Sequence, residues 1–85
     1  MDICAGGTIS IGAQSITFTN DHKQACTITS CDMPGWPTTD PVIPAKQGST
    51  PGTGVVKLSQ PATKGDYNYT PDCCHQQNDP VIKVQ

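Results

Sequence analysis

The chain has little charge, no long apolar run and no helical periodicity. Only 14% of its 85 residues are charged, the formal net charge is −2 and the sequence pI is ≈ 5.3. Because no basic surface is available to attract phosphates, nucleic acid is not expected as a partner. No apolar run approaches the roughly 20 residues that a helix needs to cross a bilayer, so no membrane span is predicted. A repeat of about 3.6 residues among the apolar positions is absent as well, which argues against a helical fold.

Aromatic residues are also scarce, which limits the hydrophobic core that the chain can form. The sequence has one Trp, one Phe and two Tyr, but five cysteines. A chain of this length buries about 60–65% of its extended surface, so we expect one domain over residues 1–85 that adds disulfides or a metal to its core. Disulfides persist outside the cytosol, which predicts a secreted or periplasmic protein. No apolar signal segment follows Met1, so we interpret Met1 as an expression start on the mature chain.

Apolar and polar residues alternate with a period of two in several short runs, which is the pattern of half-buried β-strands. These runs are residues 8–12, 16–20, 25–31, 54–59, 65–70 and 81–84. The first two runs are separated by a segment short enough for a hairpin and are predicted to pair antiparallel. Proline and glycine are frequent from 32 to 54, which excludes a long helix there, and Trp36, Val42 and Ile43 are expected to cover one edge of the core. The sequence therefore predicts an all-β Greek-key sandwich of six to seven short strands.

The five cysteines leave several disulfide pairings open. In their extended run, Cys26 and Cys31 lie on opposite faces and about 16 Å apart, beyond the roughly 7 Å limit for a disulfide. A Cys73–Cys74 bridge is disfavoured because it would close a strained eight-membered ring. One cysteine must stay free within the chain, which allows fifteen connectivities. Cys4 is expected to pair with Cys73 or Cys31, and Cys31 is the candidate for the free thiol.

Residues 65–75 gather the most reactive side chains of the chain. An aromatic strand leads directly into Cys73, Cys74 and His75, whose side chains bind soft metals or take part in redox chemistry. His75 is interpreted either as a ligand or as a solvated loop residue, and His22 in an earlier polar loop is expected to be exposed rather than a ligand. No carboxylate pair, Ser/His/Asp set or glycine-rich phosphate loop is evident, so an enzyme is not predicted.

Two stretches together resemble the cupredoxin family of small copper β-sandwiches. The first, residues 8–28, contains Ile16-Thr17-Phe18-Thr19-Asn20, which is similar to the family's Val/Ile-x-Phe-x-Asn strand. The second contains Gly65-x-Tyr67-x-Tyr69, a cysteine and histidine loop and a final strand at 81–84, similar to the strands on either side of the family's copper loop. The resemblance covers about two-thirds of the chain and implies a cupredoxin-like sandwich with a metal site at one end.

The ligand positions of that family are altered in this sequence. Cys26 stands where the family has its first copper-binding histidine, Pro71 where it has the cysteine and Cys74 where it has the second histidine. No methionine follows. A type 1 blue-copper site needs two histidines, a cysteine and a weak axial ligand, so blue-copper electron transfer is not implied. The resemblance does imply that Cys26 and Cys74 lie together at the metal-binding end.

Two interpretations of that end remain open. In the first, a Cys26–Cys74 disulfide replaces the copper site, and closing about 47 intervening residues would stabilise the fold by about 4 kcal/mol. In the second, Cu(I) is held by Cys26 and Cys74 together with Cys73 or His75, because thiolates prefer soft metals. The copper interpretation predicts a small exported copper-handling protein that is not a blue-copper protein.

The disulfide interpretation predicts a non-catalytic, disulfide-stapled structural or assembly domain that has lost its metal site. Such a domain is expected to have a protein partner or to self-associate, through an unpaired cysteine or a strand edge. A thiol redox module built on Cys73 and Cys74 is a third hypothesis.

Overall fold

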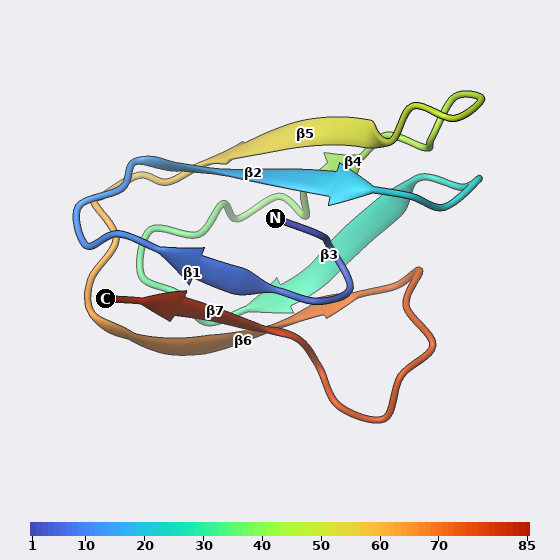
Figure 1. Cartoon of the computed structure of the whole chain (residues 1–85). Coiled ribbons are helices and arrows are strands. Elements are labelled where there is room, and N and C mark those ends of the chain that lie inside the picture. Colours follow the sequence, from blue (N-terminus) through green and yellow to red (C-terminus); the bar gives the residue numbers. More distant parts are fainter.

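The computed structural model describes all residues from 1 to 85 and contains strands but no helix. The chain forms seven strands, which are labelled in Figure 1. They are β1 (Gly7–Ile9), β2 (Ser15–Asn20), β3 (Cys26–Cys31), β4 (Val42–Ile43), β5 (Gly52–Lys57), β6 (Gly65–Pro71) and β7 (Val81–Val84). The all-β class and the predicted number of short strands are confirmed. No helix long and apolar enough to cross a membrane is present.

The strands form a curled five-stranded sheet and a small two-stranded sheet. The order in the larger sheet is β1-β7-β6-β3-β4, and β2 and β5 make up the smaller one. All neighbouring strands are antiparallel except β1 and β7, which are parallel. In Figure 1 the small sheet lies above the strands β1, β7 and β6. The chain crosses between the sheets four times, at the β1–β2, β2–β3, β4–β5 and β5–β6 connections.

The predicted hairpin between the first two runs is wrong, because β1 and β2 belong to different sheets. The segment before β1 lies beside β2, where the Ile3 N–H donates to the Thr19 carbonyl at 3.0 Å. The chain then turns at Gly6, whose φ of 72° is left-handed, and β1 joins β7. The turn after β1 binds another turn instead of closing a hairpin, since the Gly12 N–H donates to the Ala62 carbonyl at 2.8 Å. Alternation predicts which face of a strand is buried, but not which strand lies beside it.

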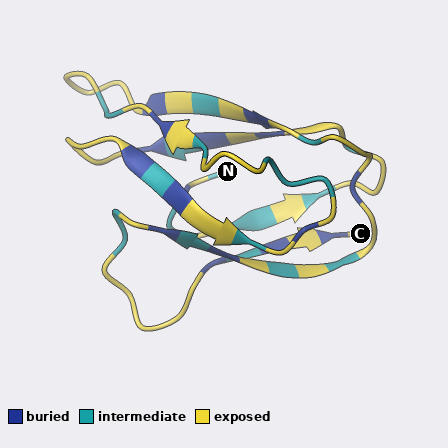
Figure 2. Cartoon of the chain, turned by 180° about the vertical axis from the view of Figure 1, so that it is seen from behind, coloured by how far each residue is buried: buried dark blue, intermediate teal, exposed yellow.

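The core lies between the two sheets and is built from the alternating apolar positions. Buried and exposed residues alternate along β2 (Figure 2). Phe18 of β2 is fully buried, and its ring centroid lies 5.4 Å from that of Tyr69 in β6 and 6.4 Å from that of Trp36. The Tyr69 hydroxyl donates to the Ile3 carbonyl at 2.7 Å, so this buried polar group is satisfied. Burial raises the pKa of Tyr69.

A β-bulge in β3 changes the side to which Cys31 points. Ile28 lies opposite Pro71 and Cys31 lies opposite Tyr69, so three steps along β3 match two steps along β6. The extra residue reverses the alternation, and Cys31 packs half-buried against the core. The expectation that Cys26 and Cys31 lie on opposite faces of the strand is therefore wrong. Burial raises the pKa of the Cys31 thiol above its ordinary value.

Candidate functional site

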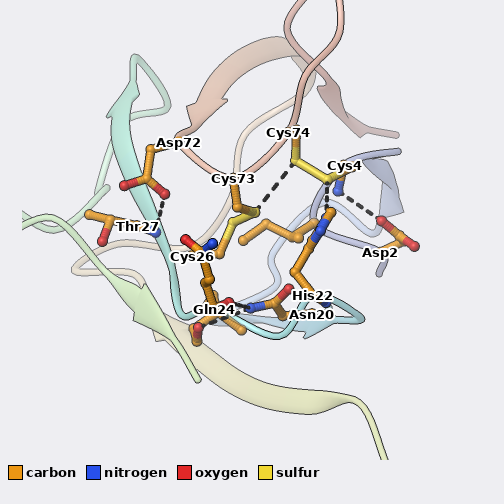
Figure 3. The surroundings of a disulfide bond; sticks show 12 residues. Asp2, Cys4, Asn20, His22, Gln24, Cys26, Thr27, Asp72, Cys73 and Cys74 are labelled. Atoms are coloured by element: carbon orange, nitrogen blue, oxygen red, sulfur yellow. Dashed lines mark hydrogen bonds between the residues drawn. A yellow bond between two sulfur atoms is a disulfide. The ribbon is translucent and has the colours of Figure 1, made fainter. Parts of the chain in front are cut away.

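Four of the five cysteines meet at one end of the molecule, where three segments of the chain converge. Cys4 precedes β1, Cys26 begins β3, and Cys73 and Cys74 follow β6 in the long loop before β7. Figure 3 shows these side chains together with the loop between β2 and β3. Two disulfides form, Cys26–Cys73 with Cα atoms 5.2 Å apart and Cys4–Cys74 with Cα atoms 5.6 Å apart. We call these the inner and the outer disulfide, and Cys31 is the free cysteine, as predicted.

The antiparallel ladder of β3 and β6 explains the inner disulfide. It continues past the end of β6 through Asp72 and Thr27, where the Asp72 N–H donates to the Thr27 carbonyl at 2.9 Å. The Thr27 N–H donates in return to Asp72 Oδ1 at 2.9 Å. Cys26 and Cys73 are the next residues on the two strands, so they lie opposite one another. The predicted Cys26–Cys74 bond is therefore wrong by one residue.

The adjacent cysteines of the loop bond to two different segments. Cys73 bonds to the buried Cys26, while Cys74 bonds to Cys4, so the expectation that Cys4 pairs with Cys73 or Cys31 is wrong. The sulfurs of Cys73 and Cys74 nevertheless remain 3.7 Å apart (Figure 3). The two disulfides are thus in contact, and together they crosslink three segments of the chain at one site.

Asn20, the last residue of β2, holds the loop that carries His22. Its side chain is fully buried, and Nδ2 donates to the Gln24 carbonyl at 2.9 Å and to the Pro44 carbonyl at 3.1 Å. Its Oδ1 accepts from the His22 N–H at 2.9 Å. The His22 carbonyl in turn accepts from the Lys46 N–H at 2.9 Å. The backbone of His22 is therefore fixed on both sides, although its side chain is exposed as predicted.

The fixed backbone places the His22 imidazole beside the outer disulfide. Its Nε2 lies 3.3 Å from Cys4 Sγ (Figure 3). The Cys4 N–H donates to Asp2 Oδ1 at 2.8 Å, and the Cys4 carbonyl accepts from Gln76 Nε2 at 2.9 Å. Gln76 belongs to the same loop as Cys74, so one hydrogen bond holds Cys4 to this loop in addition to the disulfide.

Two groups of potential metal ligands result. In the first group, the sulfur atoms of Cys4, Cys73 and Cys74 and a ring nitrogen of His22 all lie within 4.8 Å of one another. The second group combines the sulfurs of Cys26 and Cys73 with a carboxylate oxygen of Asp72. The predicted metal set was Cys26, Cys73, Cys74 and His75. Its three cysteines all occur in these groups, divided between them, whereas His75 is in neither.

Reasoning from the sequence considered Cys4 as a disulfide partner of Cys73 but not as a potential ligand, and it missed His22 as a member of the site. Cys4 and His22 lie about 50 or more residues from the cysteine pair along the chain, and no local pattern connects them to it. The one usable signal was Asn20, because an asparagine at a strand end often organises the turn that follows.

The oxidation state of the sulfurs decides what the site can do. As disulfides they crosslink the three segments, whereas as thiolates they would be strong ligands for soft metals. No protein-family model, no curated protein and no solved structure matches the chain. The geometry and chemistry of this end of the molecule are therefore the guide to function.

Proposed function

We propose that the protein is an exported, non-catalytic structural or assembly domain of cupredoxin-like Greek-key fold, in which two disulfides occupy the end where that family binds copper. One observation carries the proposal: both members of the Cys73-Cys74 pair are bonded, one to Cys26 and the other to Cys4. Four of five cysteines are then unable to act as thiolate ligands. Two disulfides in so small a chain also favour an oxidising compartment, the periplasm or the extracellular space.

The residues that carry the cupredoxin resemblance support the fold assignment. Phe18 and Asn20 are fully buried and Tyr69 is 1% exposed. Cys26 and the loop after β6 lie at the same end of the molecule, as the resemblance implies. The burial of these residues and the position of Cys26 are the observations that support a cupredoxin-like sandwich.

An exposed strand edge is the surface best suited to assembly. Of the four edge strands, β1 and β4 have only three and two residues, and the outer edge of β2 is covered by the N-terminal segment through the Asp2–Thr19 bridge, whereas β5 has six residues and pairs only with β2. Short edges resist pairing with another chain, so β5 is the edge that a partner or a second copy would extend. Val55 on β5 is 56% exposed. Cys31 is less suited to crosslinking, because it is half-buried and its pKa is raised by burial.

Copper handling is the second candidate, and the group of Cys4, His22, Cys73 and Cys74 is the observation that favours it. Three sulfurs and an imidazole nitrogen form a soft donor set that suits Cu(I). This function requires at least part of the site to be reduced, whereas the structural function requires both disulfides to be closed.

Counting free thiols and metal in the same sample separates the two candidates. Protein recovered from an oxidising compartment is unfolded without reductant, alkylated and weighed by intact mass spectrometry, and its metal content is measured in parallel. The structural function predicts one alkylated thiol and no stoichiometric metal. Three or more free thiols together with stoichiometric copper would replace it with the copper-handling function.

A further inference from the structure

The two disulfides of the site differ in how readily a reductant can reach them. The inner one pairs Cys26, which is 0% exposed, with Cys73, which is half-buried and lines a surface cavity of ≈ 340 Å³, so only one of its two cysteines is open to solvent. The outer one lines a surface cavity of ≈ 340 Å³, whose wall includes Cys4, Cys74, His22 and His75. Attack on a disulfide requires a thiolate or phosphine to approach one sulfur directly. A soluble reductant is therefore expected to open the outer disulfide first.

The sulfurs of the outer disulfide would remain neighbours after that bond is broken. Cys4 is still held by Asp2 and by Gln76, whose side chain comes from the loop of Cys74. The same loop stays attached to β3 through the inner disulfide, which bonds the adjacent Cys73. Opening the outer bond thus releases two thiols without releasing the segments that carry them.

The His22 imidazole supplies a nitrogen beside these two sulfurs. Its Nε2 is 3.3 Å from Cys4 Sγ, and its backbone is fixed by Asn20 and Lys46. Ligand atoms around a metal with bonds of about 2.0 Å to nitrogen and 2.3 Å to sulfur are about 3.5–4 Å apart. Small side-chain rotations are therefore enough to place a metal between His22 and the two released thiols.

We propose that two-electron reduction of the outer disulfide converts Cys4, Cys74 and His22 into a three-coordinate site for Cu(I), while the inner disulfide stays closed. This proposal rests on the copper-handling candidate and names its ligands. A dithiol reductant supplies two electrons and two protons, becomes a disulfide itself, and leaves Cys4 and Cys74 as thiols. Binding of Cu(I) then releases those two protons to solvent and forms two bonds to sulfur and one to His22 Nε2.

The donor set favours Cu(I) over Zn²⁺. Structural zinc sites take four ligands in a tetrahedron. The fourth member of the group, Cys73, remains oxidised in the inner disulfide and is not available as a thiolate. Two thiolates and one imidazole form a soft, incomplete set that fits Cu(I) better.

Cu(I) binding to protein reduced at one disulfide tests the proposal. The oxidised chain is treated anaerobically with one equivalent of dithiothreitol, freed of reagent and titrated with Cu(I) in competition with bicinchoninate. Wild type is expected to bind one equivalent, and X-ray absorption should show two sulfurs and one nitrogen around copper. His22→Ala should weaken binding by at least about tenfold, since even the loss of a group that only orients a ligand costs 10–100-fold. His75→Ala is the matched control, because His75 lines the same cavity outside the ligand group, and it should bind as wild type does.

Several results would overturn the proposal. They are the absence of Cu(I) binding by the half-reduced protein, equal weakening by His75→Ala and His22→Ala, and reduction of the inner disulfide before the outer one. Displacement of Cu(I) by one equivalent of Zn²⁺ would overturn the choice of metal. None of these results changes the number of free thiols in the protein as isolated, so failure here is distinguishable from failure of the proposed structural function.

Discussion

The two disulfides close overlapping loops, so their contributions to stability are predicted to be coupled. The inner disulfide joins residues 47 apart and the outer one residues 70 apart. Once the inner bond exists, the outer bond closes only the remaining loop of about 23 residues, which is the difference between these separations. Loop-closure entropy gives about 4.0 kcal/mol for 47 residues, about 4.4 for 70 and about 3.4 for 23. The two bonds together should therefore contribute about 7.4 kcal/mol, about 1 kcal/mol less than the values for each bond alone add up to.

Two variants isolate the bonds. Cys4→Ser/Cys74→Ser keeps only the inner disulfide, and Cys26→Ala/Cys73→Ser keeps only the outer one. In each protein the free energy of unfolding is measured oxidised and reduced, so that the effects of the substitutions themselves cancel in the difference. We expect differences of about 4.0 and 4.4 kcal/mol for the two variants and about 7.4 for the wild type.

Urea unfolding followed by the fluorescence of Trp36 provides the assay, because this residue packs against the core. Trimethylamine N-oxide in all samples keeps the reduced chains folded at low urea. A wild-type difference equal to or larger than the two single values added together would refute the overlapping loops. If the free energy of unfolding of either variant were the same oxidised and reduced, the disulfide that this variant retains would not form as the structure has it.

Three further predictions concern other parts of the molecule. Asn20→Ala should lower the free energy of unfolding by about 2–3 kcal/mol in urea, because the carbonyls of Gln24, Pro44 and the buried Ile43 lose the donor that the Asn20 side chain supplies, and Asn20→Asp should be at least as harmful, so tolerance of aspartate would contradict the donor role. The folded protein holds the protons of Cys31 and Tyr69 more tightly than the unfolded chain, whose ordinary pKa values are 9.0 and 10.0, so stability should fall as pH rises above these values. Urea midpoints from pH 7 to 10.5 should fall less in Tyr69→Phe than in wild type, and equal slopes would count against this. Val55→Lys should reduce self-association as measured by sedimentation velocity. Val42→Lys is the control, because Val42 is similarly exposed but lies on the shorter edge strand β4, and it should leave self-association unchanged. Equal effects of the two substitutions would exclude β5 as the assembly edge.

The strands could be predicted from the sequence because the alternation of apolar and polar residues follows directly from which face of each strand is buried. Ile16 and Phe18 in β2 and Val56 in β5 are buried at the alternating positions that the sequence predicts. Neighbours in the sheet were less predictable, because β1 pairs with the last strand of the chain rather than with the next one. That pairing depends on the turn at Gly6 and on contacts between distant turns, which short-range alternation does not encode.

The cysteine site was predictable in its location but not in its bonds. The resemblance correctly brings Cys26 to the loop after β6, yet it aligns Cys26 with Cys74. The actual partner depends on the ladder through Thr27 and Asp72, and a shift of one residue in such a ladder changes which side chain faces the neighbouring strand. The bulge in β3 similarly turns Cys31 toward the core, and one inserted residue of this kind leaves no clear pattern in a single sequence.

The central claim is the disulfide connectivity, and partial reduction with differential alkylation tests it most directly. The chain is unfolded without reductant and labelled with a first reagent, then reduced in limited steps at low pH and labelled with a second. The structure predicts the first label on Cys31 alone and then second labels that appear in pairs, Cys4 with Cys74 and Cys26 with Cys73. Paired labelling of Cys26 with Cys74, or of Cys73 with Cys74, would contradict it.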